Sequence, residues 1–218
     1  MKDRTLGVSS LVIAAAIPMF IVLFGVAGAA GMPSAAQAEP RLAAAFFHDH
    51  PLFVAAIFLN SIVMHVAVVV LAIGLYARLV STGGLWIAVG TALGVAWAVL
   101  DIAQSSIAYS ATLAAPSADA VTVDAIAKGI QNAAHLGGGI WVLSIAFAGA
   151  AVLGRALRGV GFVVGTVFAL HTLVVPLVPA WWMLEYIGLP LFFGWTGVAL
   201  LRGARPPAVV PAMNAQQA

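Results

Sequence analysis

The chain has 218 residues, of which 63% are hydrophobic and only 7% are charged, with a mean hydropathy of +1.11. Soluble domains carry about 25% charged residues, so a water-facing surface over the whole chain is excluded and a single integral membrane domain is predicted. The net charge of +2 gives no indication of nucleic-acid binding, and the absence of cysteine excludes disulfides, thiolate metal sites and thiol catalysis.

The first apolar run covers residues 11–30 and precedes an Ala-x-Ala motif, Ala36-Gln37-Ala38, of the kind found at signal-peptidase sites. The apolar core of a signal peptide is about 7–15 residues long, and this run is longer. A retained helix is therefore favoured over cleavage after Ala38. Small residues on one helix face permit close packing in membranes, so Gly25, Gly28 and Gly31 predict that this helix packs through its glycines.

Hydropathy predicts an all-α bundle of six transmembrane helices within one domain of residues 1–205. The spans are expected at about 7–30, 52–76, 85–109, 133–153, 160–177 and 183–201. In the fourth, residues 124–135 are expected to form an amphipathic lead-in, and three consecutive glycines, Gly137 to Gly139, favour a bend. Residues 206–218 are expected to be a disordered tail.

The basic residues predict the orientation. Six spans place both termini on one side, and a cytoplasmic N-terminus puts seven basic residues inside: Lys2, Arg4, Arg78, Arg155, Arg158, Arg202 and Arg205. Only Arg41 and Lys128 then fall outside. Because cytoplasmic loops are enriched in Lys and Arg, we expect a multi-pass protein of a bacterial cytoplasmic membrane with both termini and the tail in the cytoplasm.

One stretch of the third span carries polar groups where lipid would be expected. Asp101, Gln104, Ser105 and Tyr109 stand at i, i+3, i+4 and i+8 and share one helix face. A carboxylate at membrane depth costs about 2.5–3.5 kcal/mol on insertion scales. Asp101 therefore needs a partner, for which His135 and His171 are candidates, or a water-filled cavity.

At 1.5 Å per helical residue, the intramembrane polar groups fall between the midplane and the outer surface. They predict an outward-facing pocket for a small ligand or a proton, built by Asn60, His65, Asp101, Gln104, His135, His171 and Glu185. The first helix carries no such group, so it is expected at the periphery. The partners predicted from composition are the lipid bilayer and a small molecule; the oligomeric state stays open.

Three alternatives to this pocket remain open at the level of sequence. Imidazole and carboxylate groups suit a divalent metal, but no single helix carries a His-x-x-x-His or Glu-x-x-His pair. A haem b would need His65 with either His135 or His171 as axial ligands. In the third alternative the polar groups only fasten helices together. No cofactor, metal ligand or catalytic residue is assigned, and a non-enzymatic role is favoured; His48-Asp49-His50 is interpreted as loop polarity.

Two stretches carry a resemblance to a known family. The first stretch, at the end of the second span, is Ile73-Gly-Leu-Tyr-Ala-Arg-Leu79. The second, in the last span, begins Glu185-Tyr-Ile-Gly-Leu-Pro190 and continues through Trp195 to Arg202-Gly203. They are similar to an uncharacterised bacterial family of six-helix membrane proteins, known as a domain of unknown function. The resemblance implies six helices and a long outer loop after the first. It implies no enzyme activity and no cofactor. Where that family has an Arg and a Glu in the third helix, this chain has Trp97 and Asp101.

Overall fold

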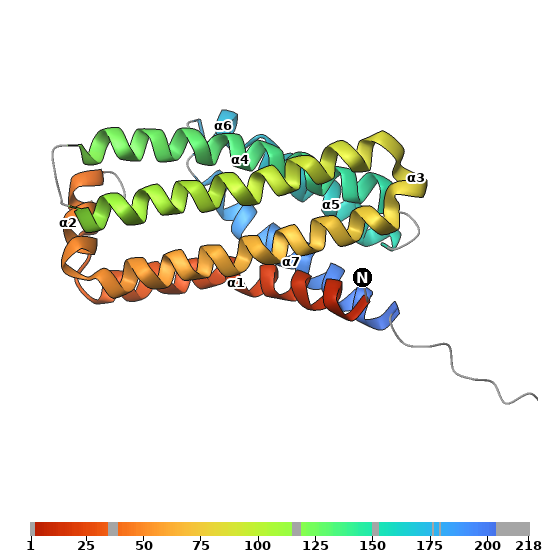
Figure 1. The fold of residues 1–218 in the computed structure, drawn as a ribbon, viewed down its shortest axis with the longest axis horizontal. Helices are drawn as coiled ribbons and strands as arrows, with labels where there is room; N and C mark the ends of the chain where they lie inside the picture. The colour runs from red at the N-terminus through yellow and green to blue at the C-terminus, as the bar shows by residue number, and fades with distance from the viewer. Residues whose placement is uncertain are drawn as a thin grey trace, which may run out of the picture.

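The computed structural model describes residues 3–34, 39–114, 119–149, 153–175, 177–178 and 180–203. These residues form an all-α protein with seven helices and no strand: α1 (Asp3–Ala29), α2 (Pro40–Asp49), α3 (Pro51–Ala114), α4 (Ala120–Ala148), α5 (Arg155–Ala169), α6 (His171–Val174) and α7 (Trp181–Gly203) (Figure 1). The predicted all-α class is confirmed. The Ala36-Gln37-Ala38 motif and the predicted 206–218 tail lie outside the described residues.

Three helices within this part of the chain are long and apolar enough to cross a membrane. They are α1, the segment Pro51–Leu113 of α3, and α7. An apolar helix of about 20 residues matches the thickness of the hydrocarbon core, and each of the three exceeds that length. The composition and the helices together support a membrane protein.

α3 contains two of the predicted spans, joined by a sharp break at Gly84. This residue has φ of 50° and ψ of −134°, a left-handed conformation that glycine adopts without the steric cost of a Cβ. Figure 1 shows the chain reversing direction at this break, so that the first half of α3 (51–83) runs back alongside the second half (85–114). Side-chain hydrogen bonds join the two halves face to face, and the polar residues that form these bonds are described below.

α4 runs continuously from Ala120 to Ala148, so the helix does not break at the glycine triplet. All three glycines are buried and serve helix packing instead. A Cβ on Gly139 would lie 2.6 Å from the Cα of Ala169, and one on Gly138 would lie 2.7 Å from the Trp97 ring. The absent side chains let α4 approach α5 and the second half of α3 closely.

The fifth predicted span, 160–177, is not one helix. α5 begins earlier, at Arg155, and ends at Ala169, and a separate short turn, α6, begins at His171. The hydroxyl of Thr172 donates to the carbonyl oxygen of Asn132 at 3.2 Å, which ties α6 to α4. The break places His171 at a helix start instead of mid-span.

The first helix is the least buried of the three apolar helices, with 22% of its apolar stretch buried against 39% in α3 and in α7, which agrees with the peripheral place predicted from its lack of polar groups. α1 packs against α7 and α3, and Leu6 and Ile13 are fully buried. Gly7 of α1 and Gly197 of α7 lie at the closest approach, where a Cβ on Gly7 would be 3.0 Å from the Gly197 carbonyl oxygen. The predicted packing face is wrong, however, because added Cβ atoms at Gly25, Gly28 and Gly31 would meet nothing within 4 Å.

Candidate functional site

A cavity of about 290 Å³ lies inside the bundle between α1, α3, α4 and α7. Along the two halves of α3 its wall runs from His65 to Val54 and from Trp97 to Thr112, and the second of these stretches is about 22 Å long. Its deep end therefore lies near the middle of the bundle, and its shallow end lies toward α2, which contributes Phe47. The volume is at the lower limit of small-molecule pockets, which are about 300–1,000 Å³.

Asp101 forms the deep end of this cavity together with Trp97 and His65. Its Oδ2 atom accepts a hydrogen bond from Trp97 Nε1 at 2.8 Å and lies 3.1 Å from His65 Nε2. All three residues are at least 93% buried. The Oδ1 atom is buried as well, has no hydrogen-bond partner among the described residues, and belongs to a residue that lines the cavity. The carboxyl group thus has an unused acceptor that is itself covered from the cavity.

The hydrogen bonds of His65 fix where its protons lie. Nδ1 is 2.8 Å from the Ser61 carbonyl oxygen, which can only accept, so Nδ1 carries the proton of that bond. The neutral ring in this tautomer has a lone pair at Nε2, and the facing carboxylate of Asp101 also offers only lone pairs. A hydrogen bond across this 3.1 Å contact therefore needs one further proton, held either by the ring or by the carboxyl group.

Above this pair, serine hydroxyls and an amide continue the polar wall. Ser61 Oγ lies 2.9 Å from Ser105 Oγ, and Ser105 donates to the side-chain oxygen of Gln104 at 3.4 Å. Ser61 belongs to the first half of α3 and the other two residues to the second half. This chain of hydroxyl and amide groups crosses the seam between the two antiparallel halves.

The shallow end of the cavity is mainly aromatic. Phe58 and Tyr109 stack with ring centroids 4.9 Å apart and an interplanar angle of 10°, and Phe47 of α2 lies at the same end. Phe20 and Phe24 of α1 complete this part of the wall. The cavity therefore changes from hydrogen-bonding groups at its floor to an apolar lining toward α2.

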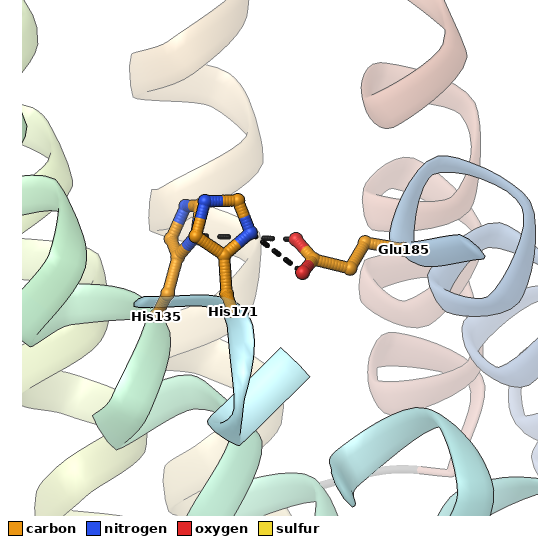
Figure 2. A group of neighbouring side chains, drawn as sticks. All are labelled: His135, His171 and Glu185. Atoms are coloured by element: carbon orange, nitrogen blue, oxygen red, sulfur yellow. Dashed lines mark hydrogen bonds and ion pairs between the residues drawn. The ribbon is translucent and has the colours of Figure 1, made fainter. Parts of the chain in front are cut away.

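A second polar cluster lies where α4, α6 and α7 meet (Figure 2). His171 Nδ1 is 2.6 Å from Glu185 Oε1, and His135 Nδ1 is 3.9 Å from Glu185 Oε2. The two imidazole rings are nearly perpendicular, with centroids 4.4 Å apart. His135 and Glu185 also line the cavity, whereas His171 does not.

Of the seven residues predicted to form the pocket, the structure brings five to the cavity wall: His65, Asp101, Gln104, His135 and Glu185. The other two lie elsewhere. Asn60 donates from Nδ2 to the Ala16 carbonyl oxygen at 2.9 Å and ties α3 to α1. His171 stands behind the wall as the partner of Glu185.

The partner expected for Asp101 was wrong. It is His65, on the other half of α3, and neither His135 nor His171. Trp97 was missed as a hydrogen-bond donor to the carboxylate, although its position four residues before Asp101 puts both on one helix face. The same spacing relates Ser61 to His65. The Ser61–His65 spacing is recognisable in the sequence, and the same i, i+4 search before Asp101 would have found Trp97.

The geometry also bears on the haem alternative. Both ring nitrogens of His65 are engaged, Nδ1 with the Ser61 carbonyl and Nε2 with Asp101. A haem iron takes a free imidazole nitrogen, and this arrangement offers none. The histidine pairings considered for haem both used His65, so the structure gives them no support.

No family model matches the chain, and no curated protein or solved structure matches it either. The resemblance to six-helix membrane proteins drawn from residues 73–79 and 185–203 thus stays a prediction.

Proposed function

We propose that this chain is a multi-pass membrane protein that binds a small molecule from the outer side of a bacterial cytoplasmic membrane, in the cavity between α1, α3, α4 and α7. The ligand has an apolar body, which contacts the aromatic shallow end, and a hydrogen-bond donor such as a hydroxyl or an amine, which reaches Asp101. The observation that supports this best is the graded lining of one 290 Å³ cavity, whose floor residue Asp101 has an unpaired buried acceptor, Oδ1.

The unpaired acceptor favours a ligand over a purely structural role. A buried carboxylate oxygen without a partner costs roughly 1–3 kcal/mol or more, so a helix-fastening pair would be expected to satisfy both oxygens. Oδ2 has two partners and Oδ1 has none among the described residues. A donor placed in the cavity by a ligand or by water would satisfy it once the carboxyl group turns toward the cavity.

The proposed topology has six crossings, two of them supplied by the two halves of α3, and cytoplasmic termini. Figure 1 places the start of α1, the break in α3 and the end of α7 at one end of the bundle, with α2 at the other. Asp3 and Arg78 form an ion pair that joins the start of α1 to the turn near Gly84. Arg155, Arg158 and Arg202 stand at helix ends of the same side. This clustering of basic residues supports a cytoplasmic location, and the cavity extends the other way.

Cysteine accessibility tests the proposal directly, because the native chain has no cysteine to remove. Gln104→Cys and Ala108→Cys place a thiol in the cavity wall, and Val99→Cys places one on the exposed, lipid-facing side of the same helix. A membrane-impermeant maleimide added from the outer side should label the first two and spare the third, since thiolate forms only where water reaches. Inert thiols at both cavity positions would reject the cavity and leave the structural role.

A second candidate is uptake of a proton by the His65–Asp101 pair. It is favoured by the extra proton that this contact needs when Nδ1 is committed to Ser61. The two candidates separate in the labelling assay. A ligand that fills the cavity protects Ala108→Cys from the maleimide, whereas a protein that only takes up protons shows no protection by any small apolar amine or alcohol tried.

A further inference from the structure

The cluster of His135, His171 and Glu185 brings one ligand atom from each of three helices into a small volume. These atoms all lie within 4.8 Å of one another. The residues come from α4, from the first position of α6 and from the start of α7. Figure 2 shows both rings and the carboxylate pointing toward one another.

Two hydrogen bonds outside the cluster hold its parts in place. The hydroxyl of Thr172 donates to the Asn132 carbonyl oxygen at 3.2 Å and fixes the start of α6 against α4. Trp181 Nε1 donates to the Val167 carbonyl oxygen at 2.9 Å and fixes the start of α7 against α5. The convergence is therefore supported by the neighbouring residues of each element, as a preorganised ligand site requires.

The cluster is poorly satisfied as a set of hydrogen-bonding groups. One short hydrogen bond joins His171 to Glu185, while His135 Nδ1 is buried and has no partner in the described part of the chain. The side chains are only 13%, 16% and 3% exposed for His135, His171 and Glu185. Among the described residues, the two histidines are the only cationic or potentially cationic groups within 4 Å of the Glu185 carboxylate. Buried polar groups in native proteins normally have partners.

We propose that His135, His171 and Glu185 bind a divalent first-row transition metal ion such as Zn²⁺. Two imidazoles and one carboxylate form the ligand set of three-residue zinc sites and also suit iron(II). Ligand atoms bound at 2.0–2.2 Å in tetrahedral geometry lie about 3.3–3.6 Å apart. The present separations of 2.6 Å to Glu185 Oε1 and 3.9 Å to Oε2 bracket that range, and all ligand atoms lie within 4.8 Å of one another, so side-chain rotations would complete the site.

A metal in this position has a free coordination site on the cavity side. His135 and Glu185 line the cavity, and His171 lies behind them. Three protein ligands leave a fourth position open to water or to a ligand group, which is the arrangement of zinc sites that are not purely structural. The metal site goes beyond the proposed ligand binding and does not depend on it.

The test is zinc binding by the full chain, purified in detergent without a polyhistidine tag and stripped with a chelator. Titration with Zn²⁺, followed by removal of free ion and elemental analysis, should find one equivalent bound. Glu185→Gln and His171→Gln keep the side-chain volume nearly constant. Each should weaken zinc binding by more than the roughly 10–100-fold that loss of an outer-shell partner costs. Co²⁺ provides a second readout, because its visible absorption reports the coordination geometry in a chain without thiolates.

The matched control is the double variant His48→Ala/His50→Ala. It removes the two other histidines that stand close together, beside Asp49 near α2, and it should keep the full equivalent of zinc. Size-exclusion profiles identify variants that do not fold, and the milder of the two ligand variants then decides. The proposal is overturned if the native chain binds no zinc, if Glu185→Gln and His171→Gln both bind it as well as the native chain, or if the control loses it.

The outcome is separable from that of the cavity. If the native chain binds zinc and its Gln104→Cys variant is inert to maleimide, the metal site is supported and the ligand cavity is rejected. Labelling of Gln104→Cys in a chain that binds no zinc does the reverse.

Discussion

The Nε2 atom of His65 lies 3.1 Å from Oδ2 of Asp101, although the two residues stand 36 positions apart on opposite sides of the break at Gly84. The same carboxylate oxygen accepts the indole N–H of Trp97 at 2.8 Å. One oxygen atom therefore serves two partners from the two antiparallel halves of α3. Any change at position 101 affects both contacts together.

The first prediction concerns the stability of substitutions at this carboxylate. Asp101→Ala removes the acceptor and leaves the Trp97 N–H buried without a partner, which should cost about 1–3 kcal/mol. Asp101→Asn should cost less, because its amide satisfies one partner: its oxygen accepts from Trp97, or its nitrogen donates to Nε2 of His65. It cannot satisfy both at the one position that Oδ2 occupies. Thermal melts in detergent measure the order, and equal tolerance of the two changes would contradict a buried pair.

A double-mutant cycle tests the shared oxygen itself. In a Trp97→Phe background the indole donor is gone, so the amide nitrogen of Asp101→Asn is free to donate to His65. The cost of Asp101→Asn should then fall below its cost in the native background, by about the 0.6 kcal/mol that interhelical polar contacts in membranes average. Additive effects of the two substitutions would mean that Trp97 and His65 do not compete for one atom.

The limits of prediction from sequence are visible at this same pair. The polar face of residues 101–109 and the need of Asp101 for a partner follow from helical periodicity and the cost of a buried carboxylate. The identity of that partner depends on how the two halves of α3 align about Gly84, where φ is 50°. His135 and His171 lie at similar depth in the topology predicted from sequence. Helical periodicity within one segment cannot decide which histidine is the partner of Asp101.

The helix boundaries show a similar division. The long apolar helices and the all-α class follow from hydropathy, and the break between the halves of α3 falls at Gly84, between the predicted spans 52–76 and 85–109. The function of the Gly137–Gly139 triplet does not follow, because low helix propensity predicts a bend whereas close contact with α5 makes the glycines a packing surface. Tertiary packing outweighs intrinsic propensity at these positions.

The next prediction separates two effects of glycine within α4, its low helix propensity and the close packing that it allows. Gly139→Ala should destabilise the protein, because the new Cβ would lie 2.6 Å from the backbone Cα of Ala169, which has no flexible end to move. Gly129→Ala is the matched control on the same helix, where a Cβ meets nothing within 4 Å. It should leave the melting temperature unchanged or raise it, as a gain in helix propensity of at most about 1 kcal/mol. Equal melts for the two variants would argue against close packing at Gly139.

Asn60 provides a prediction from a residue that the sequence assigned to the pocket and the structure does not. Its amide donates to the Ala16 carbonyl oxygen, which it reaches at 2.9 Å across the α1–α3 contact. Asn60→Leu should therefore lower stability only slightly, by about 0.6 kcal/mol. Maleimide labelling of Ala108→Cys should proceed at the same rate in this background. A changed labelling rate would show that Asn60 shapes the cavity after all.

The last prediction is the membrane topology. Alkaline phosphatase is active only outside the cytoplasm, and green fluorescent protein folds to its fluorescent form inside. Fusions after Arg78, Arg158 and Arg205 should fluoresce and lack phosphatase activity, and a fusion after Asp119 should show the reverse. The physical reason is the gathering of arginines at the end of the bundle opposite α2, where Asp3 and Arg78 also form their ion pair. An active phosphatase after Arg205 would put the C-terminus outside. With a fluorescent fusion after Arg78, it would require an odd number of crossings and place the error among the last spans; without one, it would mean that the orientation of the first spans is inverted.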